Sequence, residues 1–144
     1  FLGHDNFMNG LKQYMEKHQY GNTETYDLWS AWENVSQKPV SKVMASWTEQ
    51  MGFPVVKVLS SKWVEEKKSY ELEIEQKWFL SDGGSGGDHT KIWTIPMFVC
   101  RKGNQEQLDM FSEAKAVMTV PAETNGSWIK LNGGQNVPIR VDYT

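Results

Sequence analysis

The chain has 144 residues, enough for one ordinary domain or for one small domain and a piece of another. Hydrophobic residues make up 39% of it, with seven Trp and six Phe, which is typical of a globular protein with a well-filled core. The formal net charge is −3 and charges of both signs are interleaved, which argues against a nucleic-acid-binding protein. The nearest approach to a basic run, Lys67 and Lys68, follows Glu65 and Glu66 and is interpreted as a solvated turn.

The sequence predicts neither a membrane span nor a disulfide bond. No stretch approaches the roughly 18 consecutive apolar residues that a spanning helix needs. His4, Asp5 and Asn6 interrupt any signal-peptide pattern, and Phe1 in place of an initiator Met indicates that the true start is missing or was removed. The single cysteine, Cys100, fits a reducing compartment, so we expect a cytoplasmic location.

Three short amphipathic helices are predicted in the first third of the chain. The first covers about residues 6–18, with Asp5 as N-cap and Gly21 and Asn22 in the left-handed conformation that ends it. Its apolar stripe consists of Phe7, Leu11 and Tyr14. Gly10 costs the helix about 1 kcal/mol relative to Ala, so we expect another backbone to approach closely there.

The second and third helices follow with little connecting chain. The second is predicted to begin with Thr25 as N-cap, and Asp27 lies near the positive end of its dipole. Its buried face is Leu28, Trp29, Trp32 and Val35. The third begins with Pro39 as its first residue, and Gly52 and Pro54 mark its end. Its apolar stripe is Val40, Val43, Met44, Trp47 and Met51. Helices this short depend on tertiary packing, so we expect residues 1–52 to expose an apolar patch.

From residue 53 onward the sequence pattern is that of β-strands. Residues 70–78 alternate between apolar and charged side chains, which indicates a strand with one buried face. Residues 55–59 precede it, and the apolar run 92–100 follows as a central strand with a bulge or an unpaired side at Pro96. Shorter strands are expected near residues 117–120, 128–131 and 139–143. The predicted fold class is therefore α+β, with about three helices followed by a small antiparallel β-sandwich.

Residues that could carry chemistry are present but do not form a known arrangement. No two of the histidines His4, His18 and His89 are four residues apart and none is followed by Glu, so a zinc-binding helix is absent. Cys100 ends an apolar strand and is interpreted as a packed side chain. The remaining candidates are Glu71, Glu73 and Glu75, interpreted as a solvated strand face, and the glycine-rich residues 81–88, interpreted as a hairpin loop. The sequence thus predicts no catalytic, cofactor-binding or metal-binding residue in this chain.

Exposed aromatic side chains would support a different function. Trp63, Trp93 and Trp128 could form a platform on which a sugar or a peptide stacks. Core packing is the favoured interpretation, because Trp93 belongs to the central apolar strand. The alternative function is a stand-alone β-sandwich module that binds peptide or carbohydrate.

Two sets of motifs, one in each region, resemble a single enzyme family. The helical region contains Phe7, Gly10-Leu11, Tyr14, Tyr20-Gly21-Asn22, Asp27-Leu28-Trp29, Val43-Met44, Trp47-Thr48 and Gly52-Phe53-Pro54-Val55. The strand region contains Gln76 with Phe79, Trp93-Thr94-Ile95-Pro96, Trp128-Ile129-Lys130-Leu131-Asn132 and Arg140-Val141-Asp142-Tyr143. In this order they resemble the zinc aminopeptidases of the puromycin-sensitive type, in the gluzincin aminopeptidase family. One departure is Pro138-Ile139, where the family usually has an aromatic pair.

The resemblance implies a separate structural role for each of the two regions, which the residues alone do not show. It implies that residues 1–52 are the last helices of a catalytic domain and that residues 53–144 are a β-sandwich spacer before a later helical domain. The parent protein would be a zinc aminopeptidase that removes N-terminal residues from peptides, with its Zn²⁺ ligands upstream of the matched segment. This chain alone would then be inactive. Its partners would be the remaining domains of the parent and, indirectly, the peptide substrate, with no nucleic acid and no membrane.

Overall fold

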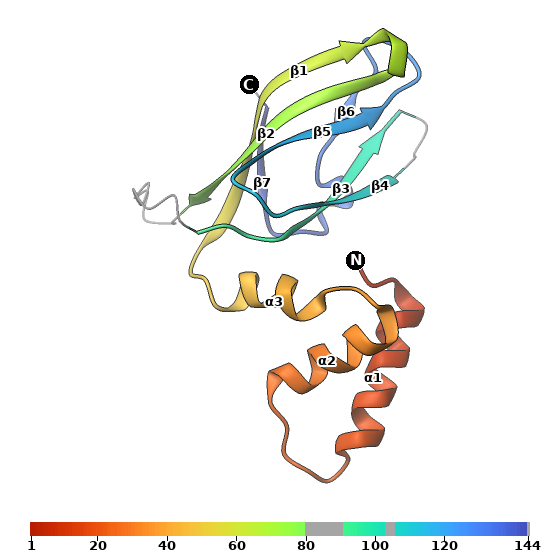
Figure 1. Ribbon diagram of the computed structural model, residues 1–144, viewed down its shortest axis with the longest axis vertical. Coiled ribbons are helices and arrows are strands. Elements are labelled where there is room, and N and C mark those ends of the chain that lie inside the picture. Colours follow the sequence, from red (N-terminus) through yellow and green to blue (C-terminus); the bar gives the residue numbers. More distant parts are fainter. Residues whose placement is uncertain (80–90, 103–105, 144) are drawn as a thin grey trace. The chain divides into compact units, whose positions relative to one another are not determined.

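The computed structural model describes residues 1–79, 91–102 and 106–143 (Figure 1). It divides the chain into two compact units, Phe1–Glu49 and Gln50–Thr144, named here the helical unit and the β unit. Within these described residues, three helices precede seven strands, so the predicted α+β class is confirmed.

The helical unit consists of α1 (His4–His18), α2 (Thr25–Ser36) and α3 (Val40–Thr48). α1 and α2 pack at Gly10, where an added Cβ would lie 3.1 Å from the Cα atom of Trp32 and 2.3 Å from its Cδ1. The predicted close approach at this glycine is confirmed. The Trp32 indole N–H donates a hydrogen bond to the Phe7 carbonyl (3.0 Å), and the two rings stack with centroids 5.0 Å apart.

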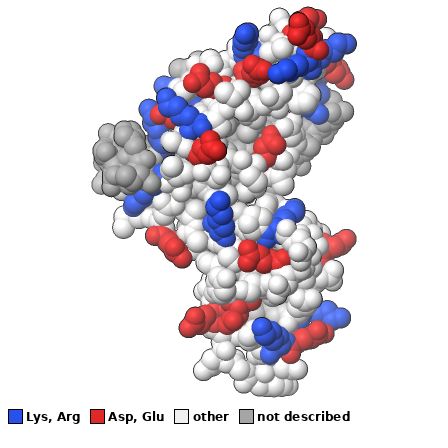
Figure 2. All heavy atoms as spheres, viewed as in Figure 1, with Lys and Arg blue, Asp and Glu red and all other residues white. Residues whose placement is uncertain are grey.

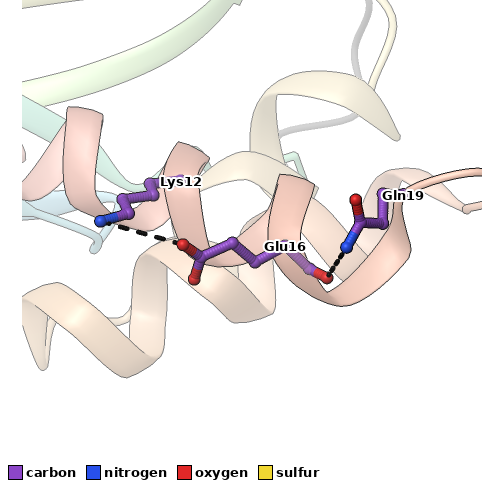
Figure 3. Close-up of polar contacts among 3 residues, drawn as sticks. All are labelled: Lys12, Glu16 and Gln19. Carbon is purple, nitrogen blue, oxygen red and sulfur yellow. Dashed lines mark hydrogen bonds and ion pairs between the residues drawn. The ribbon is translucent and has the colours of Figure 1, made fainter.

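The outward face of α1 carries weak polar contacts (Figure 3). Lys12 and Glu16 form an exposed ion pair at 3.8 Å, and the Gln19 side chain donates to the Glu16 carbonyl at 3.5 Å. Exposed pairs of this kind contribute little to stability, so the helix is held by its packed side. Among the described residues, every helix is too short or too polar to span a lipid bilayer.

Several predicted helix ends are wrong by a few residues. α1 begins after Gly3 (φ +82°), which places Asp5 in the first turn, and it ends before Tyr20, which takes the left-handed conformation expected of Gly21. Glu24, rather than Thr25, caps α2. The Asp27 carboxylate accepts a hydrogen bond from the Glu24 backbone N–H at 2.9 Å in a reciprocal capping box.

The third helix also differs from its prediction at both ends. Pro39 is the N-cap of α3 rather than its first residue, and the helix ends at Thr48 rather than just before Gly52. Gly52 does adopt a positive φ, +92°, but directly before β1 instead of at a helix end. An added Cβ at Gly52 would lie 2.4 Å from Nε1 of Trp78, and that N–H donates to the Met51 carbonyl at 2.8 Å. The glycine therefore accommodates the Trp78 ring as the chain enters the sheet.

The β unit contains two sheets (Figure 1). Its elements are β1 (Phe53–Val64), η1 (Glu65–Lys67), β2 (Ser69–Phe79), β3 (Ile95–Arg101), β4 (Glu106–Phe111), β5 (Lys115–Pro121), β6 (Ile129–Lys130), η2 (Gly133–Gln135) and β7 (Arg140–Tyr143). One sheet has the strand order β5-β2-β1-β7 and the other β4-β3-β6. Paired strands are antiparallel except β1 and β7, which run parallel.

The buried faces of the strands follow the predicted alternation. Leu72, Ile74 and Gln76 of β2 are buried. β3 is the central strand of its sheet. Pro96 on β3 pairs with Met110 of β4 on one side. On the other side the two-residue strand β6 pairs only with Cys100 and Arg101, so Pro96 has the unpaired side that was expected. The least exposed core side chains are Val56, Ile74, Trp93, Ile95, Met97, Val99, Val120 and Leu131.

A buried amide connects the two sheets. The Gln76 side chain on β2 donates to the carbonyls of Trp93 (3.0 Å) and Glu113 (2.8 Å) and accepts from the Trp93 backbone N–H (2.8 Å). Trp93 leads into β3 and Glu113 lies between β4 and β5. Gln76, on one sheet, therefore satisfies backbone groups next to the strands of the other sheet that would be costly to leave unpaired.

Replacing Gln76 should destabilise the β unit. We expect Gln76→Leu to lower the free energy of unfolding of the 144-residue chain by about 3 kcal/mol, because three backbone groups lose their partner. Glu73→Leu, on the exposed side of the same strand, is the control and should change it by less than about 0.5 kcal/mol. Chemical denaturation followed by Trp fluorescence measures both, and equal effects would contradict the role given to Gln76.

Substitution of Gly10 tests the packing of α1 on α2. Gly10→Ala should destabilise the helical unit by about 1–3 kcal/mol because the added methyl group meets Trp32, even though Ala is the better helix former. Asn9→Ala, at an exposed neighbouring position, should leave stability unchanged or raise it slightly. Denaturation followed by far-ultraviolet circular dichroism compares the two, and a gain in stability for both would refute the close contact.

Candidate functional site

The histidines that were weighed as metal ligands and rejected lie apart where the structure describes them. His4 lies at the start of α1, and His18 ends α1 with its ring 5.4 Å from that of Tyr14. His89 and the glycine-rich residues 81–88 lie outside the described residues. Within residues 1–79, 91–102 and 106–143, no three or more His, Cys, Asp or Glu side chains gather closely enough to hold a metal ion. These residues therefore offer no donor set that fits zinc.

The thiol and the strand carboxylates occupy ordinary structural positions. Cys100 is half-buried at the end of β3, where its Sγ occupies space left open by Gly133. On β2, Glu71 pairs with Lys67 at 3.1 Å and Glu75 with Lys77 at 3.5 Å, while Glu73 accepts from the Ser60 hydroxyl at 3.3 Å. These contacts agree with the predicted solvated face.

The three tryptophans do not form one stacking platform. Trp93 is fully buried, as the core-packing interpretation predicted. Trp63 lies edge-on to Tyr70 with centroids 5.0 Å apart, and its indole N–H donates to the Glu65 carboxylate. Trp128 is 53% exposed. The hypothesis of a three-tryptophan platform is therefore wrong, because one of the three rings belongs to the core.

Two tyrosines fix loops of the β unit. The Tyr70 hydroxyl donates to Asn125 Oδ1 (3.1 Å) and accepts from the Gly126 N–H (2.5 Å). The Leu131 N–H donates to the Tyr143 Oη at 2.8 Å. Burial raises the pKa of the Tyr143 phenol, and the hydrogen bond from Leu131 partly offsets that rise. The Tyr143 phenol therefore stays protonated at neutral pH and supplies no anionic base.

An apolar groove of about 460 Å³ opens on the helical unit. Its walls are the segment before α1 together with the start of α1, the side of α2 that carries Trp32, and the side of α3 that carries Val40 and Met44. Phe7 at the edge of the groove is exposed, and so are Met8, Met15 and Tyr26 elsewhere on this unit. This exposure agrees with the apolar patch predicted for the helical residues.

A second hollow, of about 310 Å³, lies in the β unit and is lined by basic side chains. Lys67 and Lys68 reach it from the turn after β1, and Arg101 and Lys102 from the end of β3. We name these four residues with their hollow the cationic pocket. The sequence predicts a solvated turn at Lys67 and Lys68 but gives no sign of the pocket, because no spacing in the sequence joins these lysines to Arg101 and Lys102.

Comparison with known proteins finds one matching family model and several similar proteins. Residues 1–47 match the model of the Peptidase family M1 domain. The chain is 33% identical over its whole length to a puromycin-sensitive aminopeptidase of Caenorhabditis elegans. Over 99% of its length it is 34% identical to Aminopeptidase M1 of Arabidopsis thaliana and 35% identical to Aminopeptidase 2 of Candida albicans.

The chain is related to the M1 aminopeptidases. It spans 15 to 17% of the length of these three relatives. The match to the M1 peptidase domain stops at residue 47, next to the last residue of α3 and two residues before the helical unit ends. The residues of this chain that match the family model are therefore nearly the same residues as those of the helical unit.

Proposed function

We propose that this chain is a non-catalytic segment of a zinc aminopeptidase that removes N-terminal residues from peptides. In this proposal the helical unit closes the peptidase domain, and the β unit is a spacer that connects it to a later helical domain and helps to shape the substrate cavity. The observation that carries the proposal is the coincidence of the M1 domain match, residues 1–47, with the helical unit, Phe1–Glu49.

The apolar groove supports a docking role for the helical unit. Its lining is mostly hydrophobic, and Phe7 at its edge is 42% exposed. A side chain of this size gains roughly 1.5–3 kcal/mol when it is buried. Because residues 1–47 match a peptidase domain model, we propose the rest of such a domain as the partner that covers the groove. The other partner in this proposal is the later helical domain, and the peptide substrate is contacted only indirectly.

Zinc and cellular location belong to the parent protein in this proposal. The described residues offer no zinc donor set, so the ion would be held by other parts of the parent. A cytoplasmic location is proposed from the lone thiol of Cys100, which fits a reducing compartment.

The 144-residue chain should have no aminopeptidase activity of its own. With added Zn²⁺ and a fluorogenic aminoacyl substrate, we expect hydrolysis no faster than with heat-denatured chain, because the described residues supply no metal site. A variant in which His4, His18 and His89 are all replaced by Ala is the control. Zinc-dependent hydrolysis by the chain that disappears in this variant would overturn the proposal.

The groove can be tested by comparing the chain with its parent enzyme. Met44→Asp should lower the melting temperature of the parent enzyme by several degrees more than that of the 144-residue chain, since only in the parent is the groove covered and the new carboxylate desolvated. Met15→Asp makes the same chemical change on α1 outside the groove. Differential scanning calorimetry of both variants in both proteins gives the comparison. An equal loss for Met44→Asp in the two proteins would mean that the groove stays open.

A further inference from the structure

The cationic pocket carries charge that the fold of the β unit does not use. Lys67 is paired with Glu71, and Arg101 donates from Nη1 to the Pro121 carbonyl at 2.7 Å. Lys68 and Lys102 are exposed and have no ion-pair partner among the described residues. Among the described residues that line the pocket, Glu123 is the single acidic side chain. The pocket is thus locally positive on a chain whose net charge is −3.

The pocket walls are fixed by main-chain hydrogen bonds. Lys68 takes the left-handed conformation (φ +44°) at the end of the turn after β1, and its carbonyl accepts a hydrogen bond from the Ala122 N–H at 2.9 Å. Ser69 and Pro121 are register partners in one sheet, and Arg101 and Ile129 in the other. The cations therefore come from both sheets and are held near one another before any ligand arrives, which lowers the entropy cost of binding.

The chemistry of the lining points to an oxyanion ligand. The guanidinium group of Arg101 and the ammonium groups of Lys68 and Lys102 form charge-assisted hydrogen bonds with phosphate or carboxylate oxygens. Ser127 adds a hydroxyl at the rim, and its oxygen lies 3.2 Å from that of Thr124. A volume of about 310 Å³ is at the lower end of the range for small-molecule sites, which run from roughly 300 to 1,000 Å³.

The visible face of the molecule carries no continuous basic stripe among its described residues (Figure 2). On the face shown in Figure 2, Lys and Arg side chains are interspersed with Asp and Glu. A protein that binds a nucleic-acid backbone would present a continuous basic stripe. The distribution of charge therefore favours a small ligand over a long polyanion.

We propose that the cationic pocket, formed by Lys67, Lys68, Arg101 and Lys102, binds a small anion that carries two or more phosphate or carboxylate groups. Lys68 and Lys102 supply the unpaired positive charge, and Arg101, held by the Pro121 carbonyl, supplies a directed guanidinium group. The site lies within the β unit and does not depend on the proposed role in an aminopeptidase.

Isothermal titration calorimetry of the 144-residue chain at low salt tests the site, with inorganic tripolyphosphate and citrate as separate probes. We expect saturable binding of one molecule per chain for at least one probe. The double variant Lys68→Asn, Lys102→Gln should weaken it at least about tenfold, because two charged contacts to the anion are lost. Asn is chosen at position 68 because it tolerates the left-handed conformation. Binding of tripolyphosphate alone would identify a phosphate site, and binding of citrate alone a carboxylate site.

A control removes the same charge elsewhere. Lys62→Gln with Lys115→Gln changes two exposed lysines of the β unit that do not line the pocket, and it should alter the affinity less than about twofold. Melting curves of both double variants confirm that they are folded. Equal weakening by the two double variants would show diffuse electrostatic attraction and overturn the proposal, as would the absence of saturable binding of either probe.

Discussion

The side-chain amide of Gln76 is the interaction on which the β unit depends. It lies on the buried face of β2, and its three hydrogen bonds go to main-chain groups that flank the second sheet. The hydrophobic core alone would hold two sheets together without fixing how one is placed on the other, because apolar contacts have little direction. A buried amide with all three partners satisfied adds direction and penalises other arrangements. The buried side chains of the core, among them Ile74 and Trp93, are thereby held in one packing.

Much of the fold could be predicted from local sequence patterns, and the errors have physical causes. The alternation in residues 70–78 predicted both β2 and its buried face, because a strand between a core and water has a period of two. The helix ends were less predictable. Tyr20 adopts the left-handed conformation that Gly21 was expected to take, and Glu24 caps α2 in place of Thr25. Several neighbouring residues could serve at each of these ends, and tertiary packing decides among them. The parallel pairing of β7 with β1 left no signal in the sequence.

The candidate sites were predictable to very different degrees. The motifs that resemble zinc aminopeptidases led to the family that the comparisons support, and helices too short to bury their own stripes predicted the exposed apolar side chains on the helical unit. The cationic pocket was missed. Lys68 and Arg101 are separated by more than thirty positions in the sequence, and the two sheets bring them to one place. A site assembled from such distant segments has no characteristic spacing, so only its three-dimensional structure reveals it.

The parallel pairing of β1 with β7 determines at which end of the sheet β1 begins and at which end β7 finishes. Val55 pairs with Arg140 and Val58 with Tyr143, so the two strands begin at the same end of the sheet and advance together. An antiparallel last strand would have returned the chain to the point where β1 starts. Instead, Val58, which lies opposite Tyr143, is five residue steps along β1 from Phe53, a displacement of roughly 17 Å at 3.3–3.4 Å per step. Neighbouring segments attached at these two points would be held apart by the length of a strand rather than placed side by side.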